Sequence, residues 1–181
     1  MTLLILGVAL WAVAHFFKRV LPGPRAALGN AGKGAVALAI VASVALMILG
    51  YRGAETVDLW YPPKWLTHVN NLLMVLAFFF YTADGMKADF VARMRHPQLT
   101  GFKTWTIAHL LVNGDLASVI LFGGLLAWAV VTVIVINRSQ REWTPKVAKP
   151  GAMPKALAAT LVTVVVVMGI HNWLGVQPWG G

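Results

Sequence analysis

The sequence contains no cysteine and few charged residues. Without cysteine, the chain has no disulfide framework and no metal site built on thiolate ligands. Charged residues make up only 12% of the chain, whereas soluble domains carry about 25%. No pair of carboxylates falls inside an apolar stretch, so acid–base chemistry by paired carboxylates is not indicated. With 59% hydrophobic residues in 181, the composition predicts an all-α, polytopic membrane helix bundle that forms a single domain over residues 1–181.

The excess of positive charge has a membrane explanation. The formal net charge is +9, which in a soluble protein would suggest nucleic acid as a partner. No basic soluble domain is present, because the basic residues lie in short loops between apolar runs. We therefore expect no nucleic-acid partner. The predicted partner is the lipid bilayer, with the basic loops at its cytoplasmic surface.

Apolar runs long enough to approach a membrane span occur along the whole chain. A spanning helix needs roughly 20 mainly apolar residues. Four runs come close to this length: Thr2–Phe17, Ala35–Tyr51, Leu66–Tyr81 and Ala156–Val176. A fifth stretch, between Lys103 and Asn137, is longer. One straight helix over it would rise about 50 Å, well beyond a hydrocarbon core of about 30 Å.

A polar triplet, Asn113-Gly114-Asp115, lies inside this long stretch and predicts a turn. Asn and Gly tolerate positive φ, and an aspartate can cap the helix that follows. With the turn, the chain has six helices, of which the fourth is short and begins near Pro97. All of the 15 basic residues except Arg52 and Lys64 then lie on one side. The positive-inside rule favours this arrangement, with both termini outside the cytoplasm. Neighbouring residues must then satisfy the polar groups of the turn.

Tryptophan and tyrosine are placed where the membrane surface is expected. The loop "DLWYPPKW" at residues 58–65 is aromatic, and Trp173 and Trp179 lie near the predicted outer end of the last helix. Trp143 lies on the predicted inner side. Because Trp and Tyr favour the membrane–water interface, we interpret these residues as anchors and not as a ligand platform.

Two histidines at membrane depth predict a cofactor. His15 lies near the cytoplasmic end of the first helix, and His109 lies about two turns after Lys103, so we expect them to face each other. Two neutral imidazoles on facing helices can ligate a haem iron. Arg19, Arg95 or Lys103 would then pair with the propionates. A structural alternative stays open, in which each histidine bonds to a carbonyl oxygen.

Two further histidines, His68 and His171, form a second pair near the outer side of the predicted bundle. Polar groups are less costly near the interface than at the bilayer centre. We therefore interpret this pair as structural.

The segment "RHPQLTGFKTWTIAHLLVNGDLASVILFG", Arg95–Gly123, resembles the signature of the NnrU family of bacterial membrane proteins. The first helix, "LGVALWAVAHFFKR", resembles the histidine-bearing N-terminal helix of that family, and the resemblance extends over essentially the whole chain. It implies a multi-pass protein of the bacterial inner membrane that is linked to denitrification. It also implies nitrite or nitric oxide reductase components as partners.

The same block resembles the related zeta-carotene isomerase, which binds haem b and isomerises a cis double bond in a carotenoid. This resemblance implies haem b as the cofactor, with His15 and His109 as iron ligands, and an apolar polyene as substrate. The isomerase has a cysteine three residues before the histidine that matches His109. Here that position is Thr106, so an exchange of ligand from histidine to cysteine is not available.

The Arg95-His96-Pro97 element also resembles the isoprenylcysteine methyltransferases, in which it helps to hold S-adenosylmethionine. The same element is typical of a helix start, since proline is favoured in the first turn. Three functions stay open. The first is a haem b protein for redox, sensing or isomerase-like chemistry, the second is a non-enzymatic assembly factor for the reductases, and the third is a methyltransferase-like enzyme. The residues predicted to bind the cofactor are His15, Arg19, Arg95, His96 and His109; none is assigned a catalytic role.

Overall fold

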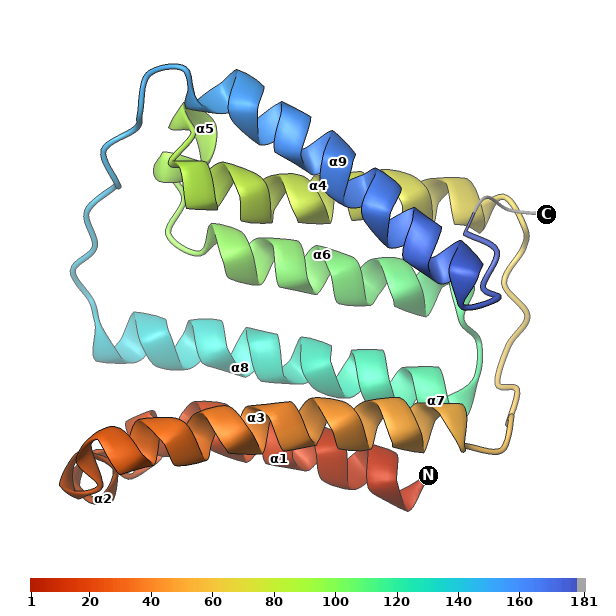
Figure 1. Ribbon diagram of the computed structural model, residues 1–181, viewed down its shortest axis with the longest axis horizontal. Helices are drawn as coiled ribbons and strands as arrows, with labels where there is room; N and C mark the ends of the chain where they lie inside the picture. The colour runs from red at the N-terminus through yellow and green to blue at the C-terminus, as the bar shows by residue number, and fades with distance from the viewer. Residues whose placement is uncertain (179–181) are drawn as a thin grey trace. The chain divides into compact units, whose positions relative to one another are not determined.

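The computed structural model describes residues 1–178 and is helical, as predicted (Figure 1). Trp179, predicted to be an interface anchor, lies outside the described residues. The helices are α1 (Thr2–Val20), α2 (Pro22–Ala27), α3 (Gly29–Arg52), α4 (Leu66–Met86), α5 (Asp89–Ala92), α6 (Pro97–Val112), α7 (Leu116–Ser118), the π-helical turn η1 (Val119–Gly123), α8 (Gly124–Ser139) and α9 (Ala152–Trp173).

Among the described residues, five helices are long and apolar enough to cross a membrane. They are α1, α3, α4, the continuous helix Leu116–Ser139 and α9. The remaining predicted membrane helix is α6, which has 16 residues. At 1.5 Å per residue it rises about 24 Å, less than a full hydrocarbon core. It is the short fourth helix that the sequence predicted, so the structure agrees with about six membrane helices.

Several helices are longer than the apolar runs from which they were predicted. α3 begins at Gly29 instead of Ala35, and α4 continues past Tyr81 to Met86. Hydropathy marks the part of a helix that lies in lipid, whereas the hydrogen-bonded helix continues until a residue breaks it. For α4 that residue is Lys87, whose φ of 58° is left-handed and ends the helix.

The chain folds as two compact units. The first unit consists of Met1–Trp60 and Gly114–Leu125, and the second of Tyr61–Asn113 and the chain from Leu126 onward. The helix Leu116–Ser139 supplies its first part to the first unit and the rest to the second. Each unit is described below by itself.

In the first unit, α1 packs against α3 at very short range (Figure 1). Small residues make this approach possible. A Cβ atom at Gly7 would lie 2.8 Å from the backbone nitrogen of Met47, and one at Gly50 would lie 2.7 Å from Leu4 Cα. Leu4 and Ser43 are fully buried in this contact region. Helix pairs in lipid rely on such packing, because lipid tails give no hydrophobic drive for association.

The predicted turn at Asn113–Asp115 is confirmed, and so is the cap. α6 ends at Val112, and Asp115 is the N-cap of α7. Its Oδ1 accepts from the backbone N–H of Ser118 at 2.8 Å, and its Oδ2 accepts from the Ser118 hydroxyl at 2.6 Å. The Tyr51 hydroxyl lies 2.8 Å from Ser118 Oγ. Since Ser118 already donates its proton to the carboxylate, Tyr51 is the donor in this second contact.

The loop before α4 satisfies the backbone of the same turn. Leu59 N–H donates to the Gly114 carbonyl at 2.7 Å, and Leu116 N–H donates to the Val57 carbonyl at 2.9 Å. These bonds accompany an antiparallel bridge between Asp58 and Asp115. The neighbours that an intramembrane turn requires are therefore residues 57–60, which the sequence analysis did not identify.

In the second unit, α4 packs against both α6 and α9 (Figure 1). The approach to α6 again depends on glycine, since a Cβ at Gly101 would lie 2.8 Å from the Ala77 carbonyl oxygen. The contact with α9 includes a pair of hydroxyls, because Thr82 Oγ1 and Thr160 Oγ1 lie 2.7 Å apart. Each of these threonines also bonds to a backbone carbonyl oxygen.

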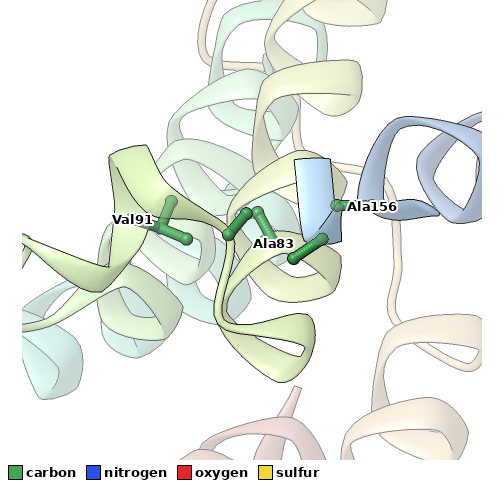
Figure 2. Packing of buried hydrophobic residues seen from close by; sticks show 5 residues of the cluster. Ala83, Val91 and Ala156 are labelled. Atoms are coloured by element: carbon green, nitrogen blue, oxygen red, sulfur yellow. The ribbon is translucent and has the colours of Figure 1, made fainter. Parts of the chain in front are cut away.

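A small core of buried hydrophobic residues lies in the second unit (Figure 2). The segment before α9 crosses α5 there, with Lys146 N–H donating to the Ala92 carbonyl at 3.0 Å. The Lys146 ammonium pairs with Asp84, whose side chain is only 6% exposed. The buried members of the core are Ala83, Ala88, Val91, Ala152 and Ala156.

Substitution of Gly50 by alanine should destabilise the first unit. The new methyl group would overlap the α1 backbone, and overpacking of this kind costs roughly 1–3 kcal/mol. Gly34→Ala is the matched control in the same helix, since nothing lies within 4 Å of a Cβ there. We expect unfolding in detergent to occur at a lower temperature for Gly50→Ala only. Equal thermal stability of the two variants would show that α1 and α3 do not approach this closely.

Removal of the Asp84 carboxylate should weaken the second unit. Asp84→Ala leaves Lys146, which is 43% exposed, to be solvated by water, so the loss should be about 1–3 kcal/mol. Asp89→Ala is the control. Asp89 and Arg93 are 68% and 75% exposed, and such surface pairs contribute only about 0–1 kcal/mol. The measurement is the free energy of unfolding in mixed micelles. A larger loss for Asp89→Ala would contradict the assigned role of Asp84.

Candidate functional site

The second unit contains a cavity of about 290 Å³ between α4, α6, α9 and the segment Val176–Pro178. Its apolar wall includes Met74, Phe78 and Val164. No charged residue lines it among the residues that the structure describes. Its polar lining consists of Thr67, Asn70, Asn71, His109, Asn113, His171 and Gln177. An uncharged cavity with a few convergent polar groups is typical of a small-molecule site.

His171, on α9, has a defined tautomer. Its Nδ1 lies 2.8 Å from the Val167 carbonyl oxygen, one turn earlier in the helix. A carbonyl oxygen can only accept, so Nδ1 carries the proton. In the neutral imidazole the lone pair is then on Nε2. His171 is also one of the residues that line the cavity.

His109 lies in the last turn of α6 and shares the cavity with His171. Its carbonyl oxygen accepts from the backbone N–H of Asn113 at 3.0 Å and from Asn113 Nδ2 at 2.8 Å. Its ring meets the edge of Trp105, with centroids 5.5 Å apart and planes at 76°. The structure thus brings His109 together with His171. His68, which the sequence grouped with His171, is exposed and does not line the cavity.

Two adjacent asparagines on α4 belong to the polar part of the wall. Asn70 Nδ2 donates to Asn71 Oδ1 at 3.1 Å, and Asn71 Nδ2 donates to the Pro178 carbonyl at 2.9 Å. Asn70 Oδ1 is buried and has no hydrogen-bond partner among the described residues. A buried acceptor without a donor is costly, and this oxygen is enclosed by the protein and not open to the cavity.

His15 belongs to the first unit and has the same tautomer as His171. Its Nδ1–H donates to the Trp11 carbonyl oxygen at 2.8 Å, which leaves the lone pair on Nε2. The Trp11 indole lies beside the ring, with centroids 4.2 Å apart. Arg19 follows one turn later and is exposed. The predicted pairing of His15 with His109 joins residues of different units and stays a prediction.

The Arg95-His96-Pro97 element is a helix start, as its proline suggested. His96 is the N-cap residue of α6, and Pro97 is the first helical residue. The Arg95 guanidinium donates to the Gln140 carbonyl, and His96 Nε2 lies 2.8 Å from Asn137 Oδ1. Both side chains therefore connect the start of α6 with the end of α8 inside the second unit, a structural role for this motif.

The donor groups are compatible with a haem and offer little to other metals. Within residues 1–178, no cluster of three or more His, Cys, Asp or Glu residues is arranged to hold a metal ion, whereas zinc usually takes three or four protein ligands. A haem iron needs one or two axial imidazoles. His15 fits such a ligand, because a ligating histidine commonly donates its other N–H to a carbonyl. The cavity beside His109 has room for a single ring or a chain end and not for a porphyrin, so the fit to haem rests on the axial imidazoles alone.

Sequence reasoning did not identify Asn70 and Asn71, and it assigned His171 a structural role only. The segment "THVNN" was the available signal. It places a histidine and two asparagines, besides a threonine, at the start of an apolar helix. The signal was ambiguous because polar residues near a helix end are tolerated at the membrane interface. Only the packing of α4 against α6 and α9 places these residues around one cavity.

Comparison with known proteins identifies a family. The model of the family described as NnrU protein matches residues 3–178, which is nearly the whole chain. No curated protein and no solved structure matches it.

Proposed function

Because the chain belongs to the NnrU family, we propose that it is a multi-pass protein of the bacterial inner membrane, linked to denitrification, that holds haem b through His15 and His109. The hydrogen bond from His15 Nδ1 to the Trp11 carbonyl carries this proposal. It orients the ring and places the lone pair on Nε2, which is the arrangement of a metal-ligating histidine.

The roles of the other residues follow from their contacts. The Trp11 indole packs against the His15 ring, with the ring centroids 4.2 Å apart. Arg19 is exposed at the end of α1 and is the candidate for pairing with a propionate. Arg95 and His96 bond to the end of α8, so they support the position of α6 and with it His109. This use of both side chains gives no support to a methyltransferase-like role.

A bound haem b would supply one-electron redox chemistry or a binding site for nitric oxide. The protein would contribute an apolar surrounding, which excludes water, and two imidazoles, of which His15 has its tautomer fixed by the Trp11 carbonyl. The apolar polyene implied by the isomerase resemblance stays a second possible substrate class for the same centre. In either case, the reductases of nitrite and nitric oxide are the proposed partners.

The test is an absorption spectrum of the detergent-purified protein, first oxidised and then reduced with dithionite. We expect sharp α and β bands of six-coordinate haem b. His15→Ala and His109→Ala should each lose most of the bound haem, whereas His68→Ala, an exposed control on α4, should keep it. Each variant is checked for a monodisperse elution profile. Unchanged haem content in His15→Ala or His109→Ala would contradict the ligand assignment.

A colourless protein, after expression with ample haem, would remove the cofactor from the proposal. The hypothesis of a non-enzymatic assembly factor would then be favoured. It predicts copurification with the nitrite or nitric oxide reductase, and that this copurification does not depend on His15.

The proposed orientation places both termini in the periplasm, and the absence of cysteine makes it straightforward to test. Glu55→Cys and Glu142→Cys introduce single thiols at exposed positions of two different loops. In spheroplasts, a membrane-impermeant maleimide should label Glu55→Cys directly and Glu142→Cys only after permeabilisation. The unsubstituted chain is the blank. The reverse labelling pattern would place the basic loops outside and contradict the orientation.

A further inference from the structure

The connection between α1 and α3 in the first unit carries a cluster of positive charge. Lys18 lies in the last turn of α1, Arg25 in the short helix α2, and Lys33 near the start of α3. Because α2 joins two helices that pack side by side, these three residues lie at the same end of the unit (Figure 1). Lys18 and Lys33 are exposed, and Arg25 is half-buried. We call these three residues the basic end of the first unit.

The carboxylates of the first unit lie far from the basic end. The sequence has no acidic residue before Glu55, which follows the opposite end of α3. Asp58 and Asp115, the remaining acids of this unit, form a bridge with each other beyond that same end. Since the 24 residues of α3 rise about 36 Å, the separation greatly exceeds a Debye length of about 8 Å. The positive charge of the basic end is therefore not compensated within the first unit, whereas two cations of the second unit pair with aspartates.

The Arg25 guanidinium is held in place on the start of α3. Its NH1 group donates to the Gly29 carbonyl oxygen at 3.2 Å. The same group packs over Gly32, where a Cβ atom would lie only 2.8 Å from it. A guanidinium has further N–H donors in a fixed planar fork, which matches the paired oxygens of a phosphate. Because the side chain is already positioned, less conformational freedom is lost when it binds such a group.

Apolar side chains are exposed beside these cations. Val20 is 70% exposed, and Leu21 and Leu28 are each 49% exposed. Charged and apolar side chains that alternate along a short connection are typical of a segment at the membrane interface. There the apolar groups contact acyl chains while the cations reach the phosphates. The chemistry that matches both is an anionic phospholipid.

We propose that the basic end of the first unit is a one-to-one binding site for a phospholipid with two phosphates, of the cardiolipin type. Arg25 contacts one phosphate through its fork, and Lys18 and Lys33 supply the remaining positive charge. Three cations exceed the single charge of one phosphodiester, and a headgroup with two phosphates matches them better. The site uses no histidine and does not require Arg19, the candidate for pairing with a propionate.

The test is a lipid titration of the delipidated full-length protein in detergent, followed by native mass spectrometry. The probes are tetraoleoyl cardiolipin, dioleoyl phosphatidylglycerol and dioleoyl phosphatidylcholine. We expect a one-to-one complex with cardiolipin that is about fivefold tighter than the complex with phosphatidylglycerol, since each further charge near a basic segment adds about that factor. Equal affinity for cardiolipin and phosphatidylglycerol would overturn the two-phosphate assignment. Equal affinity for all three lipids would overturn the site.

Variants locate the site. Arg25→Gln and Lys33→Gln each remove one cation and should weaken cardiolipin binding about fivefold. Arg141→Gln is the matched control, because Arg141 is an exposed cation in a loop of the second unit, and it should leave the affinity unchanged. Each variant is checked for a monodisperse elution profile. An equal loss in Arg141→Gln and Arg25→Gln would show that net charge alone attracts the lipid, and unchanged binding in Arg25→Gln would place the lipid elsewhere; either result overturns the assignment.

Two further measurements test the fork of Arg25 and the source of the phosphate. Arg25→Lys keeps the charge and lacks the planar fork, so it should bind cardiolipin more weakly than the parent and more tightly than Arg25→Gln. Affinity equal to that of the parent would overturn the role of the fork. Inorganic phosphate at millimolar concentration should not displace the lipid, because it cannot contact Leu21 and Leu28. Displacement by phosphate would show a site for free anions and overturn the lipid as its occupant.

Discussion

Every peptide group at membrane depth must find its hydrogen-bond partner within the chain, because hydrocarbon offers none. The turn at Asn113–Asp115 is where this constraint is hardest to meet, since it interrupts the helical bonding in the middle of an apolar stretch. The Asp115 side chain caps the next helix, and residues 57–60 bond to the backbone of Gly114 and Leu116. This irregular segment therefore has its backbone partners within the first unit, partly from its own cap and partly from a loop far away in the sequence.

The same constraint shapes the polar side chains. His15 and His171 each donate Nδ1–H to the carbonyl one turn earlier in their own helix. Thr82 and Thr160 likewise bond to helix carbonyls while their hydroxyls meet. A local bond of this kind removes the cost of a buried donor, and in histidine it also determines which nitrogen keeps a lone pair. In both histidines, the helix that carries the residue therefore determines the tautomer of the ring.

Much of the fold could be predicted from patterns along the chain. The short α6, its start at Pro97 and the cap at Asp115 all follow from residue types at adjacent positions. The predicted grouping of His171 with His68 differs from the grouping in the structure. Depth along a helix was used to group His68 with His171, whereas the structure places His171 on one cavity wall with His109. Distance along a helix axis says nothing about which face a side chain occupies or which helix lies opposite.

What the sequence by itself determined is the membrane character, the helix order and the turn. These depend on hydropathy, charge and local turn chemistry, all of which act between neighbouring residues. Only the tertiary structure decided that residues 57–60 satisfy the turn, that Gly50 lets α1 approach α3, and that Asn70 and His171 line one cavity. Each of these is a contact between residues far apart in the chain. Its physical basis is the packing of helix faces, which a single linear pattern does not specify.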